Sequence, residues 1–123
     1  MKIIMNSHAS ISRNKKSLQY AKEQLSKLQI LMNDVCINNS NTYSNLELCS
    51  YFELHNMLDL SEIIIESSLE RKESRGSHFR LDYPVRNDKE WLNHILIKKI
   101  DSGFNLSIKP VDLSDLSLET RNY

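Results

Sequence analysis

Residues 14–35, NKKSLQYAKEQLSKLQILMNDV, contain the clearest structural pattern in this chain. Apolar residues recur there at intervals of three and four, at Leu18, Ala21, Leu25, Leu28, Met32 and Val35. This spacing places the apolar side chains in one stripe along an α-helix, as in a coiled coil. We therefore predict a helix over residues 14–35 that buries this stripe against a neighbouring helix.

A second, longer helix is predicted over residues 45–74. Ser44 is followed three residues later by Glu47, the spacing of a capping box at a helix start. An apolar stripe follows at Tyr51, Leu54 and Leu58. The predicted helix end carries the basic residues Arg71, Lys72 and Arg75, which suit the negative end of a helix dipole. Gly76 follows where a left-handed C-cap is expected.

The remaining chain predicts shorter elements. Residues 88–94 suit a short helix, and residues 95–109 suit a β-hairpin that turns at Asp101-Ser102-Gly103. The tail of residues 110–123 has no periodicity, and Ile3-Ile4-Met5 suggests the end of a further helix. We expect a mainly α fold: a three-helix, spectrin-repeat-like bundle with two long antiparallel helices, followed by a small C-terminal β-hairpin, in one domain over residues 1–123.

Composition excludes several functions. The chain has 123 residues, 16 basic and 16 acidic, and a formal net charge of zero, which argues against a nucleic-acid partner. Its two glycines, Gly76 and Gly103, are too few and too far apart for a nucleotide-phosphate loop. No apolar run is long enough to span a bilayer, so direct membrane insertion is not expected.

No residue pattern predicts a catalytic, cofactor-binding or metal site. The four histidines form no zinc arrangement with cysteines or carboxylates. Cys36 and Cys49 are interpreted as reduced thiols, each a small buried hydrophobe, with a disulfide between them the less favoured alternative. Carboxylates at Glu62, Glu66 and Glu70 are interpreted as a solvated acidic ridge rather than as a catalytic pair.

Residues 70–84 combine charges, aromatic residues and a predicted helix end. One interpretation is a helix C-cap with surface ion pairs; the other is a docking surface in which Arg75, His78 and Arg80 bond to a partner. The residues alone favour the first interpretation, because nothing in the stretch activates a substrate.

The same stretch resembles a known family. Arg71-Lys72-Glu73-Ser74-Arg75-Gly76-x-His78, followed by Asp82-Tyr83-Pro84, is similar to the C-terminal helical domain of succinate dehydrogenase and fumarate reductase flavoprotein subunits and of L-aspartate oxidase. Residues 5–14, 53–64 and 106–111 extend the likeness over nearly the whole chain. Leu81 to Pro84 is closer to L-aspartate oxidase, but Trp91-Leu92-x-His94 and Arg121-Asn122-Tyr123 resemble the dehydrogenase and reductase branch, whose match is longer. Ser77 replaces the alanine usual in that branch.

The resemblance implies a part of an FAD-dependent oxidoreductase that interconverts succinate and fumarate. FAD would belong to the parent subunit and not to this chain, which we expect to be inactive alone. The implied partners are the FAD-binding domain of the same subunit and the iron–sulfur subunit, with a cytoplasmic location peripheral to the membrane. Candidate interface residues are Glu73, Ser74, Arg75, His78, Arg80 and Asp82. The alternatives are the corresponding domain of L-aspartate oxidase and a free-standing helical interaction module.

Overall fold

The computed structural model describes residues 1–101 and 103–115. Ser102, in the predicted hairpin turn, and Arg121-Asn122-Tyr123 lie outside the described residues. The chain forms two compact units, Met1–Arg86 and Asn87–Tyr123. The expectation of one domain over residues 1–123 stays a prediction.

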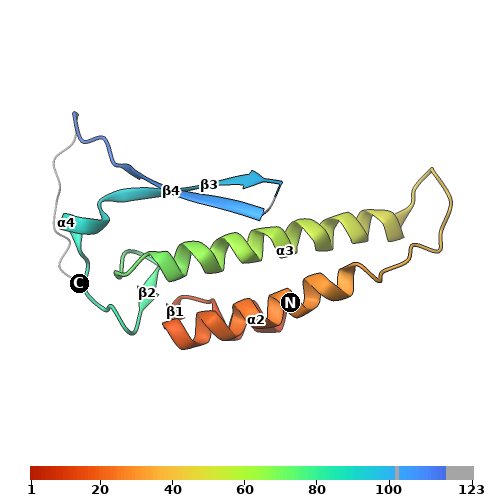
Figure 1. The fold of residues 1–123 in the computed structure, drawn as a ribbon, viewed down its shortest axis with the longest axis horizontal. Helices are drawn as coiled ribbons and strands as arrows, with labels where there is room; N and C mark the ends of the chain where they lie inside the picture. Colours follow the sequence, from red (N-terminus) through yellow and green to blue (C-terminus); the bar gives the residue numbers. More distant parts are fainter. Residues whose placement is uncertain (102, 116–123) are drawn as a thin grey trace. The chain divides into compact units, whose positions relative to one another are not determined.

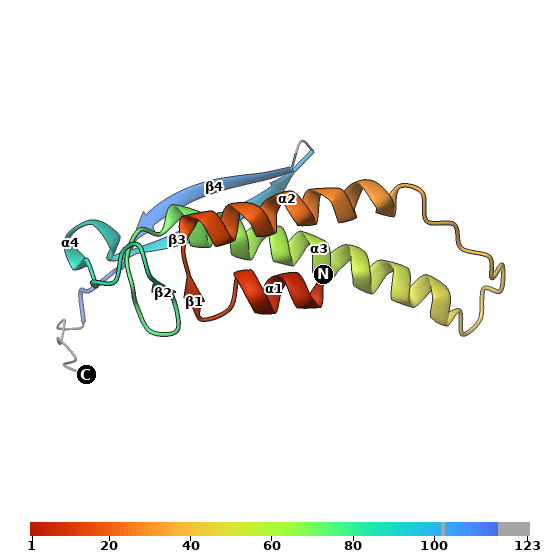
Figure 2. The ribbon, with the colours of Figure 1, turned by 90° about the horizontal axis from the view of Figure 1, so that it is seen from below.

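The first unit is built on an antiparallel helix pair. Its elements in chain order are α1 (Lys2–His8), β1 (Ser12–Arg13), α2 (Lys15–Met32), α3 (Leu46–Glu70) and β2 (Phe79–Arg80). Figures 1 and 2 show α2 and α3 side by side along their length, and Figure 2 shows the short α1 beside them. The coarse prediction of a mainly α fold is confirmed; a three-helix bundle is not, because α1 has only seven residues.

Most of the predicted stripe forms the core of this unit, but Leu28 is only partly buried and Val35 is 48% exposed. Leu18, Ala21, Leu25 and Met32 are buried, and Leu58 and Ile65 of α3 pack with them. The helix ends at Met32 and not at Val35 as predicted. The amides of Asn33, Asp34 and Val35 bond to carbonyls three residues back, at 3.1–3.3 Å, so the chain leaves the helix in a tightened last turn.

Polar contacts run beside the apolar stripe. Lys22 Nζ lies 2.5 Å from Glu66 Oε1, and Gln29 Nε2 donates to Glu62 Oε2 at 2.8 Å. Both contacts join α2 to α3. Glu62 and Glu66 therefore hold α2 and are not part of a purely solvated ridge, which corrects the expectation for these two residues.

The start of α3 differs from the predicted capping box. Asn45, not Ser44, is the N-cap, and its side chain accepts from Leu48 N at 3.0 Å. The Glu47 carboxylate instead accepts from the amides of Asn38 and Asn39, at 3.2 and 2.9 Å. Ser44 has φ of +54°, so it turns the chain and cannot supply the extended backbone usual at an N-cap.

The second unit holds the predicted hairpin. It contains α4 (Asp88–Trp91), β3 (Asn93–Ile100) and β4 (Gly103–Pro110), and the two strands pair antiparallel. The short helix ends at Trp91 and not at residue 94, because Asn93 already pairs with Pro110. The hairpin is thus slightly longer than residues 95–109. Ile97 lies opposite Leu106 and Ile95 opposite Ile108, so one face of the hairpin is apolar.

Candidate functional site

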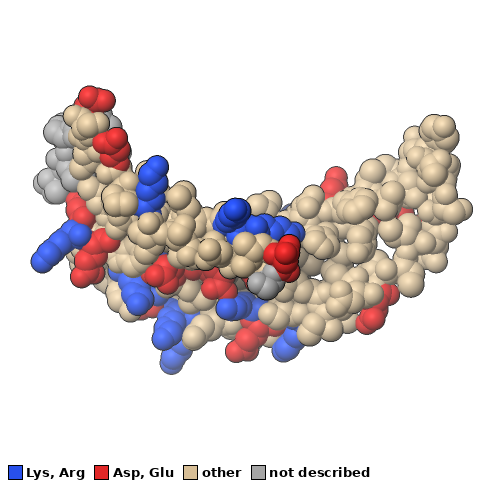
Figure 3. Space-filling view, turned by 45° about the horizontal axis from the view of Figure 1, so that its top comes forward, with Lys and Arg blue, Asp and Glu red and all other residues tan. Residues whose placement is uncertain are grey.

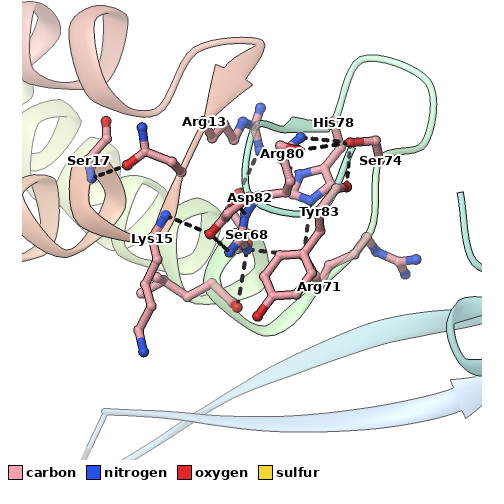
Figure 4. Close-up of polar contacts among 12 residues, drawn as sticks. Arg13, Lys15, Ser17, Ser68, Arg71, Ser74, His78, Arg80, Asp82 and Tyr83 are labelled. Carbon is pink, nitrogen blue, oxygen red and sulfur yellow. Dashed lines mark hydrogen bonds and ion pairs between the residues drawn. The ribbon is translucent and has the colours of Figure 1, made fainter. Parts of the chain in front are cut away.

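The motif residues lie in a loop that follows α3 and returns to the start of α2. This segment, residues 71–86, is called the motif loop below; its polar contacts are drawn in Figure 4. Its β2 pairs in parallel with β1, Ser12 opposite Phe79 and Arg13 opposite Arg80. Phe79 N donates to Ile11 O at 3.1 Å, and Leu81 N donates to Arg13 O at 2.7 Å. The loop is therefore tied to the segment that leads into α2.

Arg80 closes the C-terminal end of α3. Its Nη1 donates to the carbonyl oxygens of Ser68, Leu69 and Arg71, the last two at 3.3 and 3.1 Å. The side chain is 1% exposed. The last carbonyls of a helix lack hydrogen-bond donors within it and carry the negative end of its dipole. The buried guanidinium supplies both the missing donors and a positive charge.

This contact explains where α3 stops. The prediction of a helix to residue 74 with Gly76 as its C-cap is wrong: α3 ends at Glu70, and Arg71 is the C-cap. Gly76 lies instead in a tight turn, in which the Arg75 and His78 backbones bond to each other at 2.8 and 3.1 Å. Its φ of +59° at the first central position is the geometry that a type II′ turn reserves for glycine.

Asp82 joins Arg80 to the start of α2. Its two carboxylate oxygens accept from Nε and Nη2 of Arg80, each at 2.8 Å. Oδ2 also accepts from Lys15 N, the first amide of α2, at 3.0 Å. The Arg80 hydrogen bonds, aided by the Lys15 amide, lower the pKa of Asp82 to about 2. One ion pair thereby connects the positive end of α2 with the negative end of α3.

Glu73 is the buried centre of two further ion pairs, with Arg71 and Arg75. Its side chain is 0% exposed, and Oε1 accepts from Arg71 Nη1 at 2.6 Å. Arg75 donates to both carboxylate oxygens, through Nε at 2.8 Å and Nη2 at 3.0 Å. A buried carboxylate is tolerated when its oxygens are paired in this way. These contacts hold Arg71, Glu73 and Arg75, at the start of the motif loop, to one another.

His78 lies between α3 and β1. Its Nε2 lies 3.3 Å from Arg71 O, and its Nδ1 lies 3.1 Å from Arg13 Nη1. Arg13 also donates to Ser68 Oγ at 2.6 Å. Burial lowers the pKa of His78, and the charges of Arg13, Arg80 and Arg71 lower it further against the opposing effect of the Arg71 carbonyl.

Ser74 ties the two ends of the motif loop together. Its hydroxyl donates to Tyr83 O and accepts from Arg80 N, both at 2.9 Å, while its amide donates to Val85 O at 3.3 Å. The guanidinium of Arg80 also lies 5.1 Å from the centre of the Tyr83 ring. Ser74 therefore joins the start of the loop to residues 80–85 near its end.

All six candidate interface residues therefore come together in one cluster, and each bonds within the chain. The sequence reasoning did not include Arg13, Ser68 or the Lys15 amide, which complete the cluster from β1, α3 and α2. Arg13 stands in the segment that resembles the family, but nothing local shows that it meets His78, 65 residues away.

Apolar side chains cover the outside of the motif loop. Phe79 and Tyr83 are each 39% exposed, Leu81 is 56% exposed and Val85 is 74% exposed. Hydrogen bonds to Ile11, Arg13 and Ser74 hold the backbone of residues 79–81, which carries part of this apolar surface. The four side chains form the exposed surface of the motif loop.

Other candidate chemistry is sparse in the described residues. Within residues 1–101 and 103–115, no group of three or more His, Cys, Asp or Glu residues could hold a metal ion, and no helix is long and apolar enough to cross a membrane. Cys36 and Cys49 are free and exposed, so their interpretation as buried hydrophobes is wrong. Charged side chains are spread over the helix pair in Figure 3, whereas the connection of residues 33–45 carries only Asp34.

An antiparallel helix pair that is closed at one end by the Arg80–Asp82 ion pair defines a mainly α domain. The family model described as fumarate reductase flavoprotein C-term matches residues 1–123, and the chain belongs to this family.

Curated relatives and a solved structure agree with this assignment. The succinate dehydrogenase flavoprotein subunit of Rickettsia bellii is 39% identical over 98% of this chain and 20% of its own length. The fumarate reductase flavoprotein subunit of Helicobacter pylori (strain J99) is 36% identical over 78% of this chain and 13% of its own. A variant of E. coli quinol fumarate reductase superposes with a TM-score of 0.90 at 29% identity, covering 96% of this chain and 21% of that one.

Proposed function

We propose that this chain acts as the C-terminal domain of a flavoprotein subunit of succinate dehydrogenase or fumarate reductase. The observation that carries the proposal is the family match over residues 1–123, together with relatives of both names. The chain spans about a fifth of the length of the Rickettsia relative. The parent would hold FAD and exchange a hydride and a proton between succinate and fumarate, while this part contributes no reacting group.

The motif loop is the proposed contact with the rest of the enzyme. Its outer side chains, Phe79, Leu81, Tyr83 and Val85, are apolar and exposed, and apolar groups at a fixed backbone suit the core of a protein interface. Most polar groups of the six motif residues are already bonded within the chain. These residues would therefore act by holding the exposed surface in place and not by contacting the partner themselves.

The partner of the loop in this proposal is the FAD-binding domain of the same subunit, with the iron–sulfur subunit nearby. The parent complex would then place the chain in the cytoplasm, peripheral to the membrane. Support comes from the family description and from the exposed apolar surface of a loop whose ends are both anchored.

The size of the native polypeptide tests the main proposal. An antibody raised against the chain should detect, in extracts of the source cells, a polypeptide about five times as long as this one, because the chain spans 20% of the Rickettsia relative. Material captured with the antibody should contain flavin. A band at 14.4 kDa without flavin would contradict the proposal and favour a free-standing interaction module.

The activity of the captured polypeptide separates the two oxidoreductase branches. We expect it to oxidise succinate or reduce fumarate and not to oxidise L-aspartate. The purified chain of 123 residues should show neither flavin absorbance nor activity. Flavin bound one-to-one by the purified chain would contradict the assignment of FAD to the rest of the parent.

A further inference from the structure

His78 is held by two neighbours whose hydrogen-bonding roles are fixed. The Arg71 carbonyl oxygen, 3.3 Å from Nε2, can only accept, so Nε2 carries a proton. The Arg13 guanidinium, 3.1 Å from Nδ1, can only donate, so Nδ1 carries none. The contacts therefore define a neutral imidazole in a single tautomer.

The charges around the ring make this neutrality important. Arg13 faces His78 from β1, Arg71 from the end of α3 and Arg80 from β2. The two carboxylates of the cluster bond elsewhere: Glu73 accepts from Arg71 and Arg75, and Asp82 accepts from Arg80 and Lys15 N. The ring thus contacts the Arg13 guanidinium directly, and the charges of Arg80 and Arg71 also lower its pKa.

Arg13 depends on the neutral ring as an acceptor. Within the described residues, its hydrogen-bond partners are neutral: Ser10 O, Ser68 Oγ and His78 Nδ1. Burial, and then the positive charge of Arg80, lower the pKa of Arg13, so a further positive charge beside this side chain is unfavourable. A proton on Nδ1 would remove one of its acceptors and add a further positive charge beside it.

We propose that His78 is an acid-sensitive latch: the neutral ring joins β1 to the end of α3, and protonation of Nδ1 releases β2 and the motif loop from β1. The released contacts are the Arg13–His78 hydrogen bond and the two backbone bonds from Phe79 N and Leu81 N, whereas Asp82 stays bonded to Arg80 and to Lys15 N. The helix pair is held by its own core and by Lys22–Glu66, so it remains folded.

The direction of the pH effect follows from linkage. Protonation of His78 is easier when the loop is released than when it is latched, so the latch is fully closed above about pH 6.5, the ordinary histidine pKa. As the pH falls below about 6.5, the released state binds the proton first and is stabilised relative to the latched state. This gain stops when the ring of the latched state is protonated as well. Latching therefore weakens towards acid pH.

Two measurements on the full 123-residue chain test this latch. Long-range ¹H–¹⁵N spectra of the imidazole should show the Nε2–H tautomer at neutral pH and a pKa below about 6.5. Amide exchange at Phe79 and Leu81 should lose protection by several-fold, and by at most about tenfold per pH unit for one proton, as the pH falls through this range. An Nδ1–H tautomer, a pKa of about 6.5 or higher, or protection that does not change with pH overturns the proposal.

Two variants provide the comparison. His78→Gln can donate and accept but cannot titrate, so protection at Leu81 should become independent of pH over the same range. His94→Gln removes an exposed histidine on β3 and should keep the pH dependence of the unaltered chain. If His78→Gln keeps the full pH dependence, another group is responsible and the proposal fails; if the variant does not fold, the imidazole spectra of the unaltered chain decide.

Discussion

The carboxylate of Asp82 accepts hydrogen bonds from Nε and Nη2 of Arg80, each at 2.8 Å. It also accepts one from the first backbone amide of α2, that of Lys15, at 3.0 Å. Arg80 in turn donates to three carbonyl oxygens at the end of α3. A single ion pair therefore closes the antiparallel helix pair at one end. The motif loop, which contains both residues, is held in place by the same contacts.

Arg80→Lys should destabilise the first unit. Lysine cannot reproduce a two-pronged contact with Asp82 together with bonds to the helix carbonyls, because its ammonium is a point donor on a flexible stem. Unsatisfied buried carbonyls should cost roughly 1–3 kcal/mol of the free energy of unfolding. Urea denaturation measures this loss. Lys27→Arg, an exposed change on α2, is the control, and an Arg80→Lys loss no larger than that of the control would show that the cap does not stabilise the unit.

Asp82 should make stability depend on acid pH. Its pKa of about 2 in the folded chain lies below the ordinary 3.8, so its contribution is complete above pH 3.8 and is lost as the pH falls towards about 2. Since the side chain is 30% exposed, solvent screening limits the effect to about 1 kcal/mol.

The measurement compares the unfolding free energy of the unaltered chain and of Asp82→Asn between about pH 5 and about pH 2. The difference between them should shrink as the pH falls. Asp34→Asn, at an exposed position, should follow the unaltered chain at every pH. If the difference in unfolding free energy between Asp82→Asn and the unaltered chain stays constant with pH, Asp82 is not the group whose protonation changes the stability.

Leu25→Ala should be costly because Leu25 is 2% exposed in the core between α2 and α3. Truncation of a buried leucine typically costs about 2–5 kcal/mol, through lost burial and the cavity left behind. Ile30, on the same helix, is 64% exposed, so Ile30→Ala should change stability by no more than about 0.5 kcal/mol. Thermal or urea unfolding of both variants checks this, and equal effects would place Leu25 outside the core.

The sequence predicted the parts of the fold that depend on local pattern. In the stripe from Leu18 to Met32, every predicted residue except the partly buried Leu28 is buried, and alternating residues with Gly103 mark the hairpin correctly. The helix ends were predicted less well. α3 stops at Glu70 because Arg80, ten residues further on, satisfies its last carbonyls, and no local signal reports a cap supplied by the tertiary structure.

In the candidate site, too, the residues that form a local motif were predicted, and those that tertiary contacts bring in were not. The motif placed Glu73, Arg75 and His78 in one functional cluster, and the structure brings them together. Arg13 and Ser68 were missed because they reach the cluster through β1 and α3, from positions 65 and 10 residues before His78. The expected capping box at Ser44 failed because the chain turns there in a left-handed conformation and moves the cap to Asn45.

Leu81→Ala is the most direct test, because the motif residues are proposed to hold the loop while its exposed side chains contact the rest of the enzyme. Leu81 is 56% exposed, and only its backbone bonds to β1, so the variant should unfold within about 0.5 kcal/mol of the unaltered chain. In the whole flavoprotein subunit, the same change should lower the temperature at which FAD is released. Unchanged FAD release in the whole subunit, or equal destabilisation of the isolated chain, would contradict the account.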